Sequence, residues 1–177
     1  MSDLYVSWED YHLKIEQLAV LIHQSAWEFD QILCLARGGL RIGDALSRLF
    51  DKPLAILSTS SYGGKDFQER GNLKIASNIT MTTETLGDRI LLVDDLVDSG
   101  VTLANILQWL TQHSQFTVKE VRSAVIWYKE CSTAKPDYYI DYLADNPWIH
   151  QPFEKYEKLT PQDLLPFAKE DGLKTSN

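Results

Sequence analysis

The chain has 177 residues and a formal net charge of −8 at pH 7, and 44% of its residues are hydrophobic. This length fits a single domain with a substantial core, and the acidic balance argues against a general nucleic-acid-binding protein, which needs a basic face. The two cysteines have no metal-ligand spacing and suit a reducing cytoplasm, and the sequence contains neither a secretion signal nor a membrane-spanning apolar run.

The first part of the chain predicts a helix, a buried strand and a second helix. Apolar residues at helical spacing place the first helix over residues 8–25, with Ser7 as its N-cap. The strand over residues 31–36 runs into an Arg-Gly-Gly turn at 37–39, and the second helix follows over 41–50. Two glycines let a backbone approach a ligand closely, and a guanidinium suits phosphate oxygens. Gly-Gly before a helix is equally consistent with an ordinary tight turn.

A second strand is predicted over residues 53–59, and a polar, glycine-rich connection follows over residues 60–71. Connections of that length are usually functional lids or disordered segments. A mobile surface hairpin without a function is the alternative. The chain is expected to return to the sheet in a strand over residues 75–81.

The next stretch carries the strongest chemical signal. Four apolar residues at 90–93 predict a strand buried on both faces. Asp94 and Asp95 stand at its end, and a turn of small residues at 98–102 leads into an amphipathic helix. Free amides at a helix start attract phosphate, whereas paired carboxylates suit hydroxyl groups or a divalent cation. The combination predicts a ribose 5-phosphate site, and the alternative is a buried strand followed by a capped helix.

The remaining strands complete an open α/β pattern. A buried strand is predicted over residues 118–127 and ends in Tyr128-Lys129, and a short strand is predicted over residues 137–142. In the tail, a helix is expected to begin near Thr160 and to end early at Pro166. Alternating strands and helices favour a parallel sheet that binds ligands at the carboxyl ends of its strands. We therefore expect Arg37, Asp94 and Lys129 to line one crevice.

The run from Asp94 to Gly100, Asp-Asp-Leu-Val-Asp-Ser-Gly, resembles the phosphoribosyl pyrophosphate (PRPP) signature of the type I phosphoribosyltransferases, in the branch that uses 6-oxopurines. The resemblance extends over about residues 4–157. It implies an α/β fold with an open, twisted, mainly parallel sheet, helices on both faces and a small hood. The expected domain covers residues 1–160, with a flexible loop at about 61–74 and the hood at about 129–157. Residues 161–177 are expected to form a tail.

The resemblance also implies roles for individual residues. The pyrophosphate site would be formed by Arg37 and Gly38, with a cis peptide bond between Ala36 and Arg37. The ribose and a magnesium ion would be held by Asp94 and Asp95, with Glu154 as a further metal residue. The 5-phosphate would be held by Asp98, Ser99, Gly100, Val101 and Thr102, with Asp98 also acting as the general base. The flexible loop would begin with Ser61 and Tyr62, and the base would be bound by Lys129, Trp148 and Ile149.

The implied reaction joins hypoxanthine, guanine or xanthine to PRPP, with Mg²⁺, and gives a nucleoside 5′-monophosphate and pyrophosphate. This would be a cytoplasmic purine-salvage enzyme, a homodimer or homotetramer, with no nucleic-acid or membrane partner. A non-catalytic PRPP-sensing regulator on the same fold, an unrelated nucleotide-binding α/β module and a phosphoribosyltransferase for another base stay open. Lys135 is the rival of Lys129 for the base, and His150 leaves the choice of purine open.

Overall fold

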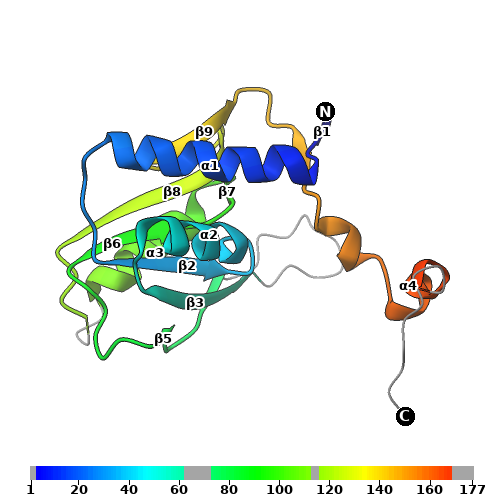
Figure 1. Cartoon of the computed structure of the whole chain (residues 1–177). Coiled ribbons are helices and arrows are strands. Elements are labelled where there is room, and N and C mark those ends of the chain that lie inside the picture. Colours follow the sequence, from blue (N-terminus) through cyan, green and yellow to red (C-terminus); the bar gives the residue numbers. More distant parts are fainter. Residues whose placement is uncertain (1–2, 62–72, 113–115, 169–177) are drawn as a thin grey trace, which may run out of the picture.

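A computed structural model of the chain describes residues 3–61, 73–112 and 116–168. In this part of the chain, eight strands form one sheet with β4, β3, β2, β6, β8 and β7 as successive neighbours, while β5 pairs with β3 and β9 pairs with β8 (Figure 1). The bounds are β2 (Gln31–Ala36), β3 (Leu54–Ser61), β4 (Leu73–Ile75), β5 (Thr80–Met81), β6 (Arg89–Val93), β7 (Leu96–Val97), β8 (Glu120–Lys129) and β9 (Tyr138–Leu143). Only the pairings of β4 and β5 with β3 are antiparallel. The predicted open, mainly parallel sheet is therefore confirmed.

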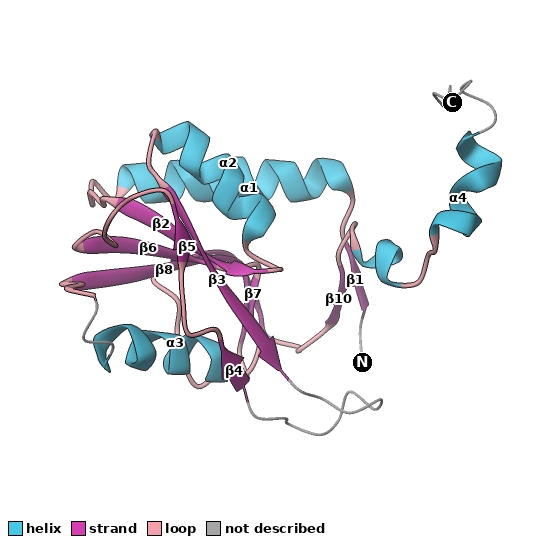
Figure 2. Cartoon of the chain, turned by 90° about the horizontal axis from the view of Figure 1, so that it is seen from below, coloured by secondary structure: helices cyan, strands magenta, loops and turns pink. Residues whose placement is uncertain are grey.

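Helices cover both faces of the sheet. Two of them, α1 (Trp8–Gln24) and α2 (Leu40–Phe50), lie together on one face, and α3 (Val101–Gln112) lies on the other (Figure 2). The strands separate the two layers because successive side chains point to opposite faces. In β2, Ile32 and Cys34 pack into the core shared with α1 and α2, while Leu33 and Leu35 pack against α3.

A separate two-stranded sheet joins the start of the described chain to residues 148–150. Strand β1 (Asp3–Tyr5) pairs in parallel with β10 (Trp148–His150), and the Val6 amide continues the pairing by donating to the His150 carbonyl at 3.1 Å. A 3₁₀ turn, η1 (Glu154–Glu157), follows, and the short α4 (Pro161–Ala168) projects away from the sheet (Figure 1). Neither strand of this small sheet was predicted.

Two predictions about local structure were wrong. The expected strand over residues 75–81 is two short strands, β4 and β5, because bends at Ser77 and Asn78 separate them. Helix α4 continues through Pro166 to Ala168. The carbonyl that loses its helical partner to Pro166 belongs to Gln162, which is exposed, so water can satisfy it. None of the helices in the described ranges combines the length and the apolar character that a membrane crossing requires.

Candidate active site

Three neighbouring strands deliver the predicted site residues to one edge of the sheet. Strands β2, β6 and β8 are adjacent and parallel, so the loops that leave their carboxyl ends lie side by side. The first loop carries Arg37 and Gly38, the second carries Asp94 and Asp95, and the third begins at Lys129. The register pairs Cys34 with Val93 and Val93 with Ala124, which aligns the ends of β2 and β6 beside β8.

The loop after β2 packs closely against the end of β6. Its first peptide bond, Ala36–Arg37, is cis, as the resemblance predicted. A Cβ added to Gly38 would stand 2.8 Å from Asp94 Oδ1 and would overlap the Asp95 carboxylate. A Cβ added to Gly39 would collide with the Val93 carbonyl. These two glycines therefore allow the backbone to approach the acidic pair more closely than a side chain would permit.

The acidic pair is half-buried and tightly connected. The Asp95 amide donates to Asp94 Oδ1 at 3.0 Å, and Asp95 Oδ2 accepts a hydrogen bond from Gln151 Nε2. Burial, and next the charge of Asp95, raise the pKa of Asp94 well above its usual value. The contact from Gln151 brings the hood segment that follows β10 to the end of β6.

A polar cleft of about 500 Å³ opens beside this pair. Its lining includes six predicted site residues: Arg37, Gly38, Asp94, Asp95, Thr102 and Glu154. The hood contributes Gln151, Phe153 and Glu154, and burial raises the pKa of Glu154. Arg37 stays at the rim, because 84% of its side chain is exposed and its guanidinium pairs with Glu157 at 3.1 Å.

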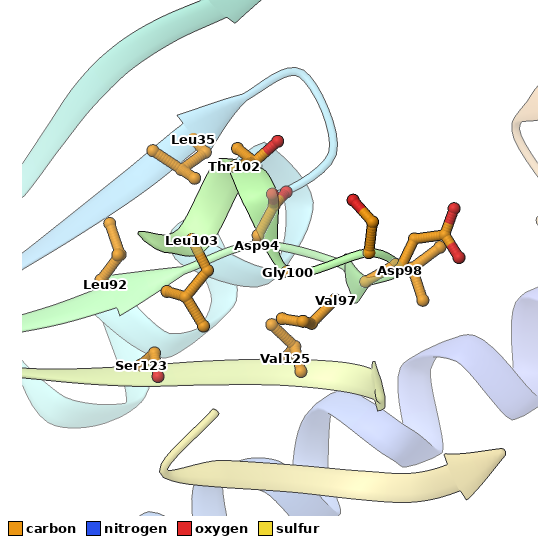
Figure 3. Close-up of a pocket in the computed structure, with 12 residues that line it drawn as sticks. Leu35, Leu92, Asp94, Val97, Asp98, Gly100, Thr102, Leu103, Ser123 and Val125 are labelled. Carbon is orange, nitrogen blue, oxygen red and sulfur yellow. The ribbon is translucent and has the colours of Figure 1, made fainter. Parts of the chain in front are cut away.

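The turn after the acidic pair contains a left-handed glycine and leads directly into a helix. Gly100 has a φ of +79°, and α3 begins at the next residue, so the first amides of α3 have no partner within the helix. Asp94 and Thr102 line the polar cleft and also a smaller cavity of about 100 Å³ behind the turn (Figure 3). In this view the Asp98 carboxylate points away from that cavity.

Lys129 meets the turn from β8. Its side chain is only 8% exposed, and its Nζ lies 3.1 Å from Asp98 Oδ1, whose own side chain is 59% exposed. The loop after β8 also holds the turn, since the Thr133 amide donates to the Ser99 carbonyl at 3.0 Å. The rival, Lys135, has its Nζ 5.9 Å from the centroid of the Tyr139 ring. This geometry joins Lys129 to Asp98, while the contact of either lysine with a base stays a prediction.

The hood strand β10 divides its residues between two environments. Ile149 is 5% exposed and joins the core, whereas Trp148 is 53% exposed, on a different sheet from Lys129. His150 stacks on Tyr5 with ring centroids 4.3 Å apart, and its Nε2 lies 3.5 Å from Asp3 Oδ1. Trp148 is therefore exposed, and its stacking on a base next to Lys129 stays a prediction.

The donor set suits a magnesium ion that is shared with a substrate. Among the residues that the structure describes, no group of three or more His, Cys, Asp or Glu side chains is arranged to hold a metal by itself. Magnesium is commonly held by one or two carboxylates together with substrate phosphates and waters. Asp94 and Asp95 meet this condition, since both line the cleft.

Some predictions fall outside the described residues, and several residues that line the cleft were not predicted as site residues. Ser61 ends β3, but Tyr62 and most of the predicted flexible loop lie in the undescribed part. Arg41, in the first turn of α2, and Gln151 both line the cleft. For Gln151 the sequence offers only a weak signal, its place between Ile149 and Glu154. For Arg41 the signal is that a second cation follows Arg37 after four residues.

The chain matches the family model described as "Phosphoribosyl transferase domain" over residues 5–158. It is 26% identical over 155 residues to the xanthine-guanine phosphoribosyltransferase of Idiomarina loihiensis, covering 87% of this chain and 88% of that one. Among solved structures, the purine phosphoribosyltransferase from Pyrococcus horikoshii Ot3 aligns with a TM-score of 0.68 at 27% identity, over 86% of this chain and 94% of that chain. The xanthine-guanine-hypoxanthine phosphoribosyltransferase of Helicobacter pylori aligns with a TM-score of 0.68 at 24% identity, over 95% and 99%, which supports the fold.

Proposed function

The chain belongs to the phosphoribosyl transferase domain family, and from this premise we propose that it transfers the ribose 5-phosphate of PRPP to a 6-oxopurine. The products would be a nucleoside 5′-monophosphate and pyrophosphate. The observation that carries the proposal is the meeting of the loops from β2 and β6 around Asp94 and Asp95, with Lys129 of β8 paired to Asp98 in the turn that follows. The names of the relatives in Idiomarina loihiensis and Pyrococcus horikoshii favour a purine acceptor.

The two ends of the sugar phosphate have separate sites in this proposal. The amides and hydroxyls of Ser99, Gly100 and Thr102, at the start of α3, bind the 5-phosphate, because helix N-termini favour anions. Asp94 and Asp95 bind the ribose hydroxyls, because a carboxylate accepts hydrogen bonds from hydroxyl groups and its charge repels a phosphate. The loop of Arg37 and Gly38 places the pyrophosphate against this pair.

Asp98 and Lys129 are the groups assigned to the base. As N9 of the purine bonds to C1 of the ribose, the bond from C1 to the pyrophosphate oxygen breaks, and Asp98 accepts the proton from N7. The Lys129 ammonium has three donors, and Asp98 uses one of them, so another is free to reach a purine 6-oxygen. A 6-amino group would face this donor unfavourably, so adenine is expected to be a poor substrate.

Magnesium belongs to the proposal as well. Asp94 and Asp95, with Glu154 nearby, would hold it together with PRPP, and the ion would neutralise charge on the departing pyrophosphate. Both cysteines are free thiols, with Cys34 buried and Cys131 exposed, which fits the reducing cytoplasm that we propose as the location. The homodimer or homotetramer implied by the resemblance is likewise part of the proposal.

The decisive test compares acceptor bases side by side. Purified protein is incubated with PRPP and Mg²⁺ and with adenine, hypoxanthine, guanine, xanthine or orotate, and nucleotide formation is followed by chromatography. Turnover with a 6-oxopurine and little with adenine or orotate is expected. Turnover with orotate alone would refute the base assignment. Absence of turnover with every base, together with binding of PRPP, would favour the non-catalytic regulator.

A further inference from the structure

Arg41 has an unusual environment for a cation in a polar cleft. It lies in the first turn of α2, immediately after the loop that approaches Asp94 and Asp95, and it lines the cleft together with residues of the hood. Its guanidinium lies 4.4 Å from the centroid of the Phe153 ring and 5.8 Å from the centroid of the Trp8 ring. Trp8 begins α1 and Phe153 belongs to the hood, so three separate elements meet at this guanidinium.

The donors of Arg41 have no hydrogen-bond acceptor among the residues that the structure describes. Within the described ranges, its guanidinium makes no hydrogen bond or ion pair with another side chain, and its contacts are with aromatic rings. Stacking on a ring fixes the plane of a guanidinium and leaves its five N–H groups at the edge for another partner. Arg37 differs from Arg41, because one of its guanidinium nitrogens pairs with Glu157 Oε1 at 3.1 Å.

The charges around Arg41 favour an anionic ligand that carries a cation with it. Arg41 lines the same cleft as Asp94 and Asp95. Burial first, and then the charge of Asp95, raise the pKa of Tyr11, whereas Arg41 acts on that pKa in the opposite direction. Positive and negative groups therefore lie across one cleft. A bare anion would be repelled by the two carboxylates, whereas a pyrophosphate with a divalent ion can face both sides at once.

We propose that Arg41, and not the Arg37 side chain, is the cation that binds the pyrophosphate group of PRPP, and that Phe153 is the positioning residue that holds it. This assignment rests on the proposed function and names the side chain that determines affinity for PRPP. The Arg37 loop then contributes through its backbone. Because Phe153 precedes Glu154 in the hood, binding of pyrophosphate also fixes the hood segment at the cleft.

Steady-state kinetics test the assignment with a matched control on the same helix. Arg41→Gln should raise KM for PRPP about tenfold or more, since charge-assisted hydrogen bonds are the strong ones, while KM for the purine stays within about twofold. Phe153→Leu should raise KM for PRPP about threefold. Arg48→Gln is the control, because Arg48 is also exposed on α2 but pairs with Asp44 at 3.1 Å, and it should change neither constant.

Direct binding separates failure of this assignment from failure of the proposed function. Titration calorimetry with inorganic pyrophosphate and Mg²⁺ should give about tenfold weaker binding for Arg41→Gln than for wild type and Arg48→Gln. Equal affinity in wild type and Arg41→Gln overturns the assignment, even in an active enzyme. A larger loss in Arg37→Gln than in Arg41→Gln overturns it too. Absence of turnover by wild type counts against the proposed function, and the pyrophosphate titration still decides the role of Arg41.

Discussion

The ion pair between Lys129 and Asp98 should respond unequally to removal of its two partners. Asp98→Ala leaves an ammonium that is 8% exposed without its carboxylate, whereas Lys129→Met leaves a carboxylate that is 59% exposed and free to meet water. Exposed pairs contribute about 0–1 kcal/mol, and breaking a fully buried pair costs about 3–5 kcal/mol. The pair is buried at one end only, so Asp98→Ala should destabilise the protein by about 2 kcal/mol and Lys129→Met by about 0.5 kcal/mol or less.

Urea unfolding at pH 7 measures the difference. With a slope of about 2 kcal/mol per molar urea, Asp98→Ala should lower the midpoint by about 1 M, and Lys129→Met by only about 0.2 M. The double variant should be about as stable as Lys129→Met alone, because the stranded charge is then absent. Equal losses in the two single variants would show that burial of the lysine carries no electrostatic cost, and the reasoning would fail.

Three further predictions concern the neighbouring residues. Gly39→Ala should lower stability by about 2 kcal/mol and weaken PRPP binding, because its Cβ would meet the Val93 carbonyl and push the loop off β6; urea unfolding and PRPP titration check this, and a variant as stable as wild type would contradict it. Asp94 has a raised pKa in the folded state. Above the pKa of Asp94 in the unfolded chain, the native protein therefore holds more protons than the unfolded chain does. The free energy of unfolding then falls as the pH rises, by up to about 1.4 kcal/mol per pH unit. Asp94→Asn should lack this loss, so its stability relative to wild type should increase as the pH rises above about 4, and a constant difference would count against a raised pKa of Asp94. Asp98→Asn should lower kcat at least a hundredfold while changing PRPP affinity little; parallel losses in both would argue that Asp98 binds substrate without acting as a base.

Regular elements with continuous local patterns were predicted well. Strand β2 was predicted to the residue, because its run of apolar side chains is bounded by a turn signal at Arg37. The first helix was predicted to within one residue at its end, because Ser7 caps it and its apolar stripe is unbroken. The acidic pair and the turn over residues 98–102 were predicted as a candidate binding site because they lie between a buried strand and a helix.

The parts that sequence reasoning missed depend on distant partners. Strands β1 and β10 have three residues each, which is too short for a periodic pattern, and each exists because the other is there. The contact of Gln151 with Asp95 likewise depends on where the hood lies, and the place of Gln151 between Ile149 and Glu154 is only a weak signal for it. Arg41 faces the cleft because α2 begins at Leu40, so that Arg41 lies in the first turn of the helix. The predicted start of this helix at residue 41 did not indicate that position.

The pairing of β1 with β10 has a consequence for how activity returns after denaturation. Its register joins Asp3 to Trp148, so nearly the whole chain must be closed into a loop before these three rungs form. Contacts between residues so far apart are late events, whereas β2, β3 and β6 can associate through shorter connections. During refolding, recovery of the central sheet should precede recovery of catalysis, and molecules with a native sheet but an undocked hood should accumulate first.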